Sequence, residues 1–244
     1  MKLLKFKIIT IAILLATGFS HFNCNTPFWE NCIEVGGEIT TESRSMAVFT
    51  GIEMSIPANI YITQGSPQEV KITAKKGVLK QIETSLEQSV LLLKYDTCVS
   101  NPDSIKIYIT TRNINKLEIN GSGDISTLCP INTDNLELKI NGSGDLDIEV
   151  QADTIYNQIN GSGNIKLLGT SKALNINING SGDVQALNAP TGNCIIKVNG
   201  SGDCAVFVSK SLNIHVNGSG NVSYRGSPSV STSFYGSGSV KELK

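Results

Sequence analysis

The residues best suited to chemistry in this sequence are four aspartates that each follow a Gly-Ser-Gly tripeptide, namely Asp124, Asp145, Asp183 and Asp203. Carboxylate oxygens are ligands for Ca²⁺, and the calcium-binding repeats of bacterial β-rolls also place an aspartate after a glycine-rich turn. Those repeats recur about every nine residues, roughly half the spacing found here. The series is also interrupted by Asn164, Asn221 and Ser239. Because Asp and Asn both hydrogen-bond backbone N–H groups in turns, we expect a structural column with no calcium and no other cofactor.

Residues for catalysis are sparse. The two histidines are His21, beside the N-terminal apolar segment, and His215, which the alternation of its strand places on the outward, polar side. Four isolated acids are likewise expected on exposed strand faces: Glu118, Glu137, Asp147 and Glu149. No P-loop, nucleophile-elbow or zincin motif occurs. We therefore predict that the protein is not an enzyme.

The six cysteines contain no Cys-x-x-Cys pair, so they do not indicate a metal site. Cys194 and Cys204 occupy core-type positions on the two strands that flank one turn. Buried thiols are the expectation there, and a disulfide between them is the alternative. Cys24 follows the N-terminal apolar segment, where a bacterial lipoprotein carries its acylated cysteine. Plain signal cleavage around Gly18 or Ser20, or a disulfide from Cys24 to Cys32, remain the alternatives.

These side chains are positioned by a repeat. Asn-Gly-Ser-Gly occurs six times, and a seventh copy, Tyr-Gly-Ser-Gly, begins at Tyr235; successive copies begin 21, 19, 19, 20, 18 and 18 residues apart. The asparagines are Asn120, Asn141, Asn160, Asn179, Asn199 and Asn217. The glycines of these six turns are Gly121, Gly123, Gly142, Gly144, Gly161, Gly163, Gly180, Gly182, Gly200, Gly202, Gly218 and Gly220. We expect both glycines of each turn to adopt positive φ.

Alternating apolar residues lead into each turn, as in Leu136, Leu138 and Ile140, and predict a half-buried strand. A two-residue hairpin would explain Asn-Gly but not the nearly constant repeat length. A coil in which each repeat is one turn does need that constancy. We therefore predict an all-β, single-stranded parallel β-helix with rungs of about 18–21 residues, regular over 113–244. The stacked asparagines are expected to form a hydrogen-bonded ladder, with Tyr235 on the terminal rung.

The remaining sequence divides into three parts. Residues 1–20, with Lys2, Lys5 and Lys7 before the apolar segment Ile8–Phe19, predict a signal peptide. Residues 21–45 are predicted to be a tether, and residues 46–244 the β-helix domain. Within this domain, Phe49–Gln64 is interpreted as an atypical early rung that caps the coil, and Lys75–Glu87 as one or two helical turns. Export leaves 17 basic against 21 acidic residues, and this balance gives no basic patch for nucleic acid.

The repeated Ile/Val-Asn-Gly-Ser-Gly-Asp/Asn-Ile/Val, together with Phe49–Glu53, Ile60–Gly65 and Cys32, resembles the Bacteroidetes family described as putative auto-transporter adhesin, head GIN domain. The resemblance covers about residues 32–244. It implies a right-handed β-helix on an exported, often lipid-anchored protein. The sequence departs from this pattern in lacking Gly-Ser-Gly at Ile56–Ala58 and small residues before Cys24.

We expect a non-catalytic, adhesin-like surface module that recognises a glycan or protein ligand through the faces of the β-helix. The first alternative is an envelope scaffold that self-associates through its terminal rungs. The second is a polysaccharide-active enzyme, which needs a carboxylate cluster formed on folding. The expected location is the bacterial cell envelope, at the outer membrane or cell surface, with the periplasmic side as an open alternative. Membrane contact is expected only through a lipid on Cys24.

Overall fold

The computed structural model describes residues 32–244. The predicted signal peptide, His21, Cys24 and residues 21–31 of the predicted tether lie outside the described residues. The strands are β1 (Ile33–Glu34), β2 (Ile39–Arg44), β3 (Gly51–Met54), β4 (Ala58–Gln64), β5 (Glu69–Lys75), β6 (Ile82–Glu87), β7 (Val90–Tyr95), β8 (Val99–Ser100), β9 (Ile105–Thr111), β10 (Lys116–Gly121), β11 (Asp124–Thr127), β12 (Ile131–Gly142), β13 (Leu146–Gly161), β14 (Ile165–Gly180), β15 (Val184–Gly200), β16 (Cys204–Gly218), β17 (Val222–Arg225), β18 (Ser229–Gly236) and β19 (Val240–Glu242). The one helix among these residues is α1 (Lys76–Leu79).

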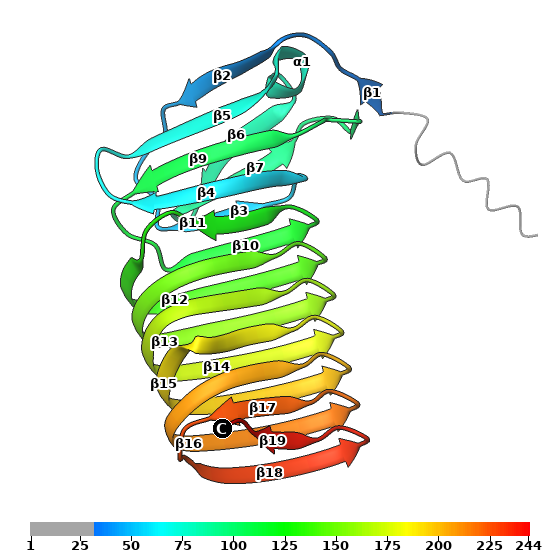
Figure 1. Cartoon of the computed structure of the whole chain (residues 1–244). Coiled ribbons are helices and arrows are strands. Elements are labelled where there is room, and N and C mark those ends of the chain that lie inside the picture. Colours follow the sequence, from blue (N-terminus) through cyan, green and yellow to red (C-terminus); the bar gives the residue numbers. More distant parts are fainter. Residues whose placement is uncertain (1–31) are drawn as a thin grey trace, which may run out of the picture. The chain divides into compact units, whose positions relative to one another are not determined.

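From β10 onward the strands stack in parallel as successive rungs of a solenoid (Figure 1). Equivalent residues of successive repeats are paired in register: Asn141 lies opposite Asn120 on one side and Asn160 on the other. Pairing within a repeat, as a hairpin would require, is absent from this part of the structure. The predicted all-β solenoid is confirmed.

Each rung contributes a segment to two facing sheets. The Asn sheet consists of the segments that lead into the turns: residues 116–121, 136–142, 155–161, 174–180, 194–200, 212–218 and 230–236. The Asp sheet consists of the segments that leave the turns: residues 124–127, 146–150, 165–168, 184–187, 204–207, 222–225 and 240–242. The long strands β13 to β16 belong to both, because each begins on the Asp sheet and ends on the Asn sheet.

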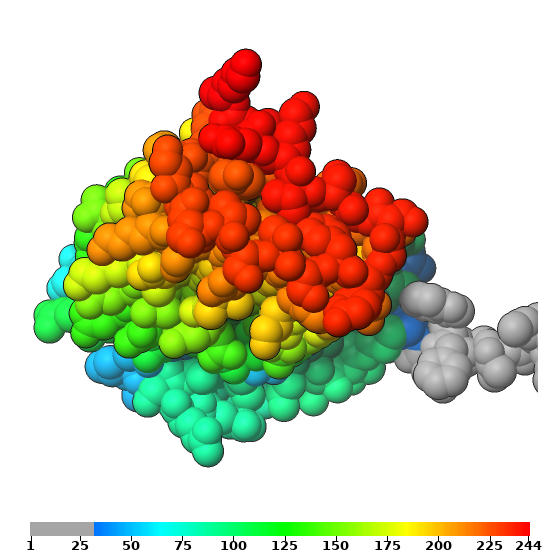
Figure 2. Space-filling model, turned by 90° about the horizontal axis from the view of Figure 1, so that it is seen from below, coloured from blue at the N-terminus to red at the C-terminus, as the bar shows by residue number. Residues whose placement is uncertain are grey.

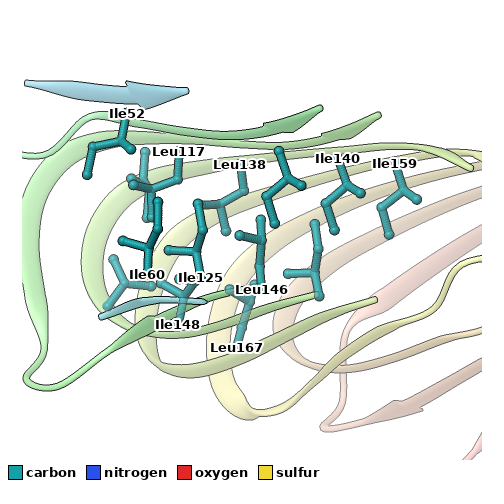
Figure 3. Close-up of a cluster of buried hydrophobic side chains, with 14 of the residues drawn as sticks. Ile52, Ile60, Leu117, Ile125, Leu138, Ile140, Leu146, Ile148, Ile159 and Leu167 are labelled. Carbon is teal, nitrogen blue, oxygen red and sulfur yellow. The ribbon is translucent and has the colours of Figure 1, made fainter. Parts of the chain in front are cut away.

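The core lies between the two sheets. Side chains from the Asn sheet, such as Leu117 and Leu138, point toward side chains from the Asp sheet, such as Ile125 and Leu146 (Figure 3). All four are at most 1% exposed. Burying one such side chain stabilises a protein by about 1.5–3 kcal/mol, so the period-two alternation of the sequence sets the two faces of every strand.

The N-terminal end departs from the sequence order. Phe49–Gln64 was expected to cap the coil. That expectation is wrong, because the β3–β4 rung that this segment forms lies between two other rungs. β3 pairs in parallel with β10 and β7, and β4 pairs in parallel with β11 and β9. The cap comes from β2, β5 and β6, which pair antiparallel with β5, β9 and β7 respectively. The expected helical stretch over Lys75–Glu87 is limited to α1, and β6 follows it.

The predicted tether is also too long. Cys32 is bonded to Cys98, β1 pairs with β8, and β2 pairs with β5, so residues 32–44 belong to the folded unit. The disulfide rules out the alternative pairing of Cys24 with Cys32. Within residues 32–244, no helix has the length and apolar character needed to cross a bilayer.

Candidate ligand-binding site

The turns that join the two sheets need both of their glycines, because stacked turns approach closely at both positions and the first glycine also has positive φ. The first glycine has positive φ, as in Gly142 at +146°. The second, such as Gly144, does not, so the expectation of two positive φ values per turn is wrong. A Cβ on Gly144 would lie 2.0 Å from the carbonyl oxygen of Gly123 in the preceding rung. The second glycine is thus required by the close approach of stacked turns.

The asparagines before these glycines form a ladder along the edge of the Asn sheet. Each Nδ2 donates to the Oδ1 of the asparagine in the preceding rung, at 2.7–3.0 Å, from Asn199 back to Asn120. Asn120 ends the ladder by donating to Glu53 Oε1 at 2.9 Å. Asn217 stacks in register on Asn199, and Tyr235 stacks on Asn217. The ladder uses one donor and one acceptor of each interior amide within the protein.

The aspartates that follow the Gly-Ser-Gly turns form a second column. From Asp124 to Asp203, one side-chain oxygen of each residue accepts the backbone N–H of the equivalent residue in the next rung; Asp183 Oδ1, for example, accepts the N–H of Asp203 at 2.8 Å. Asn164 does the same for Asp183 at 3.1 Å, which accounts for the exchange of Asp with Asn. In the part of the chain that the structure describes, no group of three or more His, Cys, Asp or Glu side chains could hold a metal ion.

Glu118 was expected on an exposed face, and that expectation is wrong. It is 5% exposed and accepts from Lys116 Nζ at 2.8 Å, Lys139 Nζ at 2.9 Å and Asn141 Nδ2 at 2.9 Å. Burial acts to raise the pKa of Glu118, but the hydrogen bonds from the two lysines outweigh it and the pKa lies below its usual value. Glu118 is a structural ion-pair centre between two rungs.

Cys194 and Cys204 are separate buried thiols. The disulfide considered between them is therefore not formed; Cys194 is on the Asn sheet and Cys204 on the Asp sheet, each in a core column. Burial raises the pKa of Cys194 to about 12 and also raises that of Cys204. His215 is exposed, as expected, and its ring meets the ring of Tyr235 edge-on at 5.7 Å.

The Asn sheet carries a groove on its outer surface, here called the Tyr156 groove. It has a volume of about 320 Å³. Tyr156 and Ile195 occupy outward positions although they are large and apolar, and they are 49% and 43% exposed. Asn175 lies between them, in register with both. In the neighbouring outward column, the groove is lined by Gln158, Asn177 and Lys197.

A larger hollow of about 410 Å³ lies on the outer surface of the Asp sheet. Its lining includes Asp183, Asp203 and the small residues Ala205 and Ser223. Both carboxylates already accept backbone N–H groups through Oδ1. Part of this hollow is therefore formed by side chains that the structural Asp column already uses.

The residues of the Tyr156 groove belong to none of the motifs found in the sequence. The signal was nevertheless present, because Tyr156 and Ile195 fall on the outward side of strands whose other outward residues are mostly polar. A single exposed apolar residue is ordinary, but two in the same outward column form a small apolar patch, and contiguous patches are the feature that marks interaction sites.

Comparison with curated proteins finds no match. Among solved structures, the chain is similar to a crystal structure of a putative adhesin from Bacteroides fragilis, with 27% identity and a TM-score of 0.83, over 86% of this chain and 100% of that one. It also shares the fold of a putative lipid binding protein from Parabacteroides distasonis, at 21% identity and TM-score 0.75, over 88% of this chain and 100% of that one. A putative adhesin from Parabacteroides merdae, at 20% identity and TM-score 0.68, has the same fold over 88% of this chain and 100% of its own.

The family comparison agrees with the motif and the rungs that it builds. A sequence model of one family matches residues 48–228, from just before β3 to just beyond β17. The chain therefore belongs to the family described as putative auto-transporter adhesin, head GIN domain.

Proposed function

We propose that the protein is an exported, non-catalytic adhesin-like module that binds a glycan or a protein through the outer surface of its Asn sheet. The observation that carries this proposal is the Tyr156 groove, where exposed apolar side chains and amides meet on an otherwise regular polar sheet. Binding sites commonly combine apolar walls with a few polar groups that fix orientation. Membership of a family named for adhesion supports the same role.

The test is an array that carries both glycans and extracellular matrix proteins, probed with the exported full-length protein. The expected result is saturable capture by a restricted set of spots. Absence of capture at protein concentrations up to about 100 µM would mean that any dissociation constant is larger than this value, and it would overturn the proposal.

The proposed location is the cell envelope, with residues 1–20 acting as a signal peptide and Cys24 as the site of lipid attachment. The motivation is the order of basic residues, apolar segment and cysteine in the sequence. Protease treatment of intact cells, with a tag after Lys244, should remove the tag if the rungs face outward. Protection until the cells are lysed would place the rungs on the periplasmic side and contradict adhesion. Mass spectrometry of the exported protein distinguishes an acylated Cys24 from plain cleavage.

A second function, as an envelope scaffold, is favoured by one feature. β18 pairs with β16 on one edge, and within residues 32–244 no strand pairs with its other edge. Figure 2 looks onto this end, where the last residues of the chain, in red, lie at the surface. β18 carries no charged residue and no proline, the devices that usually block edge pairing. Light scattering tests this function: growth of assemblies with concentration supports it, and a monomer at all concentrations contradicts it.

A further inference from the structure

The Tyr156 groove has a regular geometry because its walls are set by strand spacing. Tyr156, Asn175 and Ile195 are direct partners on three consecutive rungs. Neighbouring strands are about 4.8 Å apart, so the two walls stand about 10 Å apart with the amide between them. Side chains on a strand project roughly perpendicular to the sheet, which keeps the walls facing each other.

The space directly between the two walls holds the side chain of Asn175, which is as long as that of Ile195. The side chain of Tyr156 is longer than both and rises above them. A ligand in the groove therefore lies over Asn175 and Ile195 and against the ring of Tyr156.

The floor and flank of the groove supply unused hydrogen-bonding groups. Among the described residues, the side chains of Asn175 and Asn177 have no hydrogen-bond partner, whereas the ladder asparagines one column away donate to one another. A primary amide both donates and accepts, and so does a hydroxyl group. Lys197 adds a cation with no carboxylate within 4.0 Å in the described part of the chain. A ligand rich in hydroxyl groups matches this set.

Two other surfaces fit such a ligand less well. The hollow on the Asp sheet has no aromatic side chain in its lining. The pair Tyr61 and Tyr108 is aromatic, but the two rings stack on each other with their centroids 5.1 Å apart, so each ring covers one face of the other. The Tyr156 groove combines two apolar walls with free amides.

We propose that the Tyr156 groove binds one pyranose ring of a glycan, with a carbon face of the ring against Tyr156, its edge over Ile195 and its hydroxyl groups on Asn175 and Asn177. This inference rests on the proposed adhesin-like function and names its ligand class and its site. A volume of about 320 Å³ lies at the small end of the range for ligand pockets, which agrees with a single ring rather than a longer stretch of glycan.

The test uses the same array of glycans and matrix proteins, followed by calorimetric titration of the best glycan into the exported protein. Two variants probe the groove: Tyr156→Ala removes one wall, and Asn175→Leu replaces the two polar atoms of the floor amide with methyl groups. Tyr108→Ala is the matched control, because Tyr108 is a tyrosine of similar exposure, 42%, outside the groove. Thermal unfolding of each variant verifies the fold, since all three positions face outward.

We expect both groove variants to weaken glycan binding at least tenfold and Tyr108→Ala to change it less than twofold. Glycan binding that survives both groove variants would overturn the site while leaving the adhesin-like function intact. Capture of matrix proteins without any glycan would overturn the ligand class and again leave that function intact. Capture of nothing would overturn both.

Discussion

Asn157 is a polar side chain at a position where the neighbouring rungs carry aliphatic ones. It points into the core in register with Leu138 and Ile176, and it is 3% exposed. Neither its Oδ1 nor its Nδ2 has a hydrogen-bond partner. A buried amide without partners costs about 1–3 kcal/mol, because it has given up its hydrogen bonds to water.

Replacing Asn157 with leucine puts two methyl groups where the two polar atoms lie. The change removes the desolvation cost and adds buried apolar area, and the fit of the larger methyl groups offsets part of the gain. We expect Asn157→Leu to raise the free energy of unfolding by about 2 kcal/mol. For a chain of this length that corresponds to an increase in Tm of about 4–8 °C.

The measurement is denaturant unfolding followed by circular dichroism, with calorimetry for Tm. Asn213→Leu is the matched control, since Asn213 is exposed on the same sheet and should gain nothing. An unchanged or lowered stability of Asn157→Leu would refute the reasoning, because it would mean that the amide is satisfied in solution or that its site cannot hold the methyl groups.

Three further predictions concern the turns, the ion-pair centre and the thiols. Gly163→Ala should destabilise the protein by about 3 kcal/mol or more in denaturant unfolding, because its Cβ would lie 2.0 Å from a backbone oxygen; Gly36→Ala, which meets no atom within 4 Å, should change it by less than about 0.5 kcal/mol. Glu118→Gln should cost about 1–2 kcal/mol at pH 7, because its lysine partners are partly exposed and regain water. The pKa of Glu118 is lowered on folding, so its contribution to the free energy of unfolding is present above its unfolded pKa and is lost as the pH falls through its folded pKa. The difference in stability between Glu118→Gln and wild type should therefore shrink below about pH 4. A difference that stays constant with pH would contradict this. Iodoacetamide at pH 8, followed by mass spectrometry, should label the half-buried Cys129 first. Cys194 should be labelled only on unfolding, because burial shields its thiol and raises its pKa to about 12. Early labelling of Cys194 would contradict its burial.

The regular rungs could be predicted from sequence because each repeat carries the same local information. The alternation of apolar and polar residues determines which face of a strand is buried, and so places Leu138 in the core. The constant interval between turns determines the register of one asparagine on the next. Both signals are short-range, and every copy repeats them. The solenoid therefore followed from residues 113–244 with little ambiguity.

The N-terminal end and the groove depend on contacts between distant residues. Nothing local says that β3 will pair with both β7 and β10, or that Cys32 will meet Cys98 across 66 residues. The burial of Glu118 likewise depends on Lys139, a full rung away. Such features are set by which segments stack, and that is decided by the packing of the whole end.

The position of the β3–β4 rung gives the two ends of the stack different roles. Its upper neighbours, β7 and β9, and its lower neighbour, the β10–β11 rung, all come later in the chain, so this end is complete only when residues 49–127 have come together. Each later rung pairs only with the rungs directly before and after it, and the stability of such an array is approximately a sum over repeats and nearest-neighbour interfaces. The domain therefore consists of one fixed, non-repeating unit and a series of interchangeable ones. A duplication or loss of one unit of about 19 residues changes the number of interchangeable units and leaves the non-repeating unit untouched.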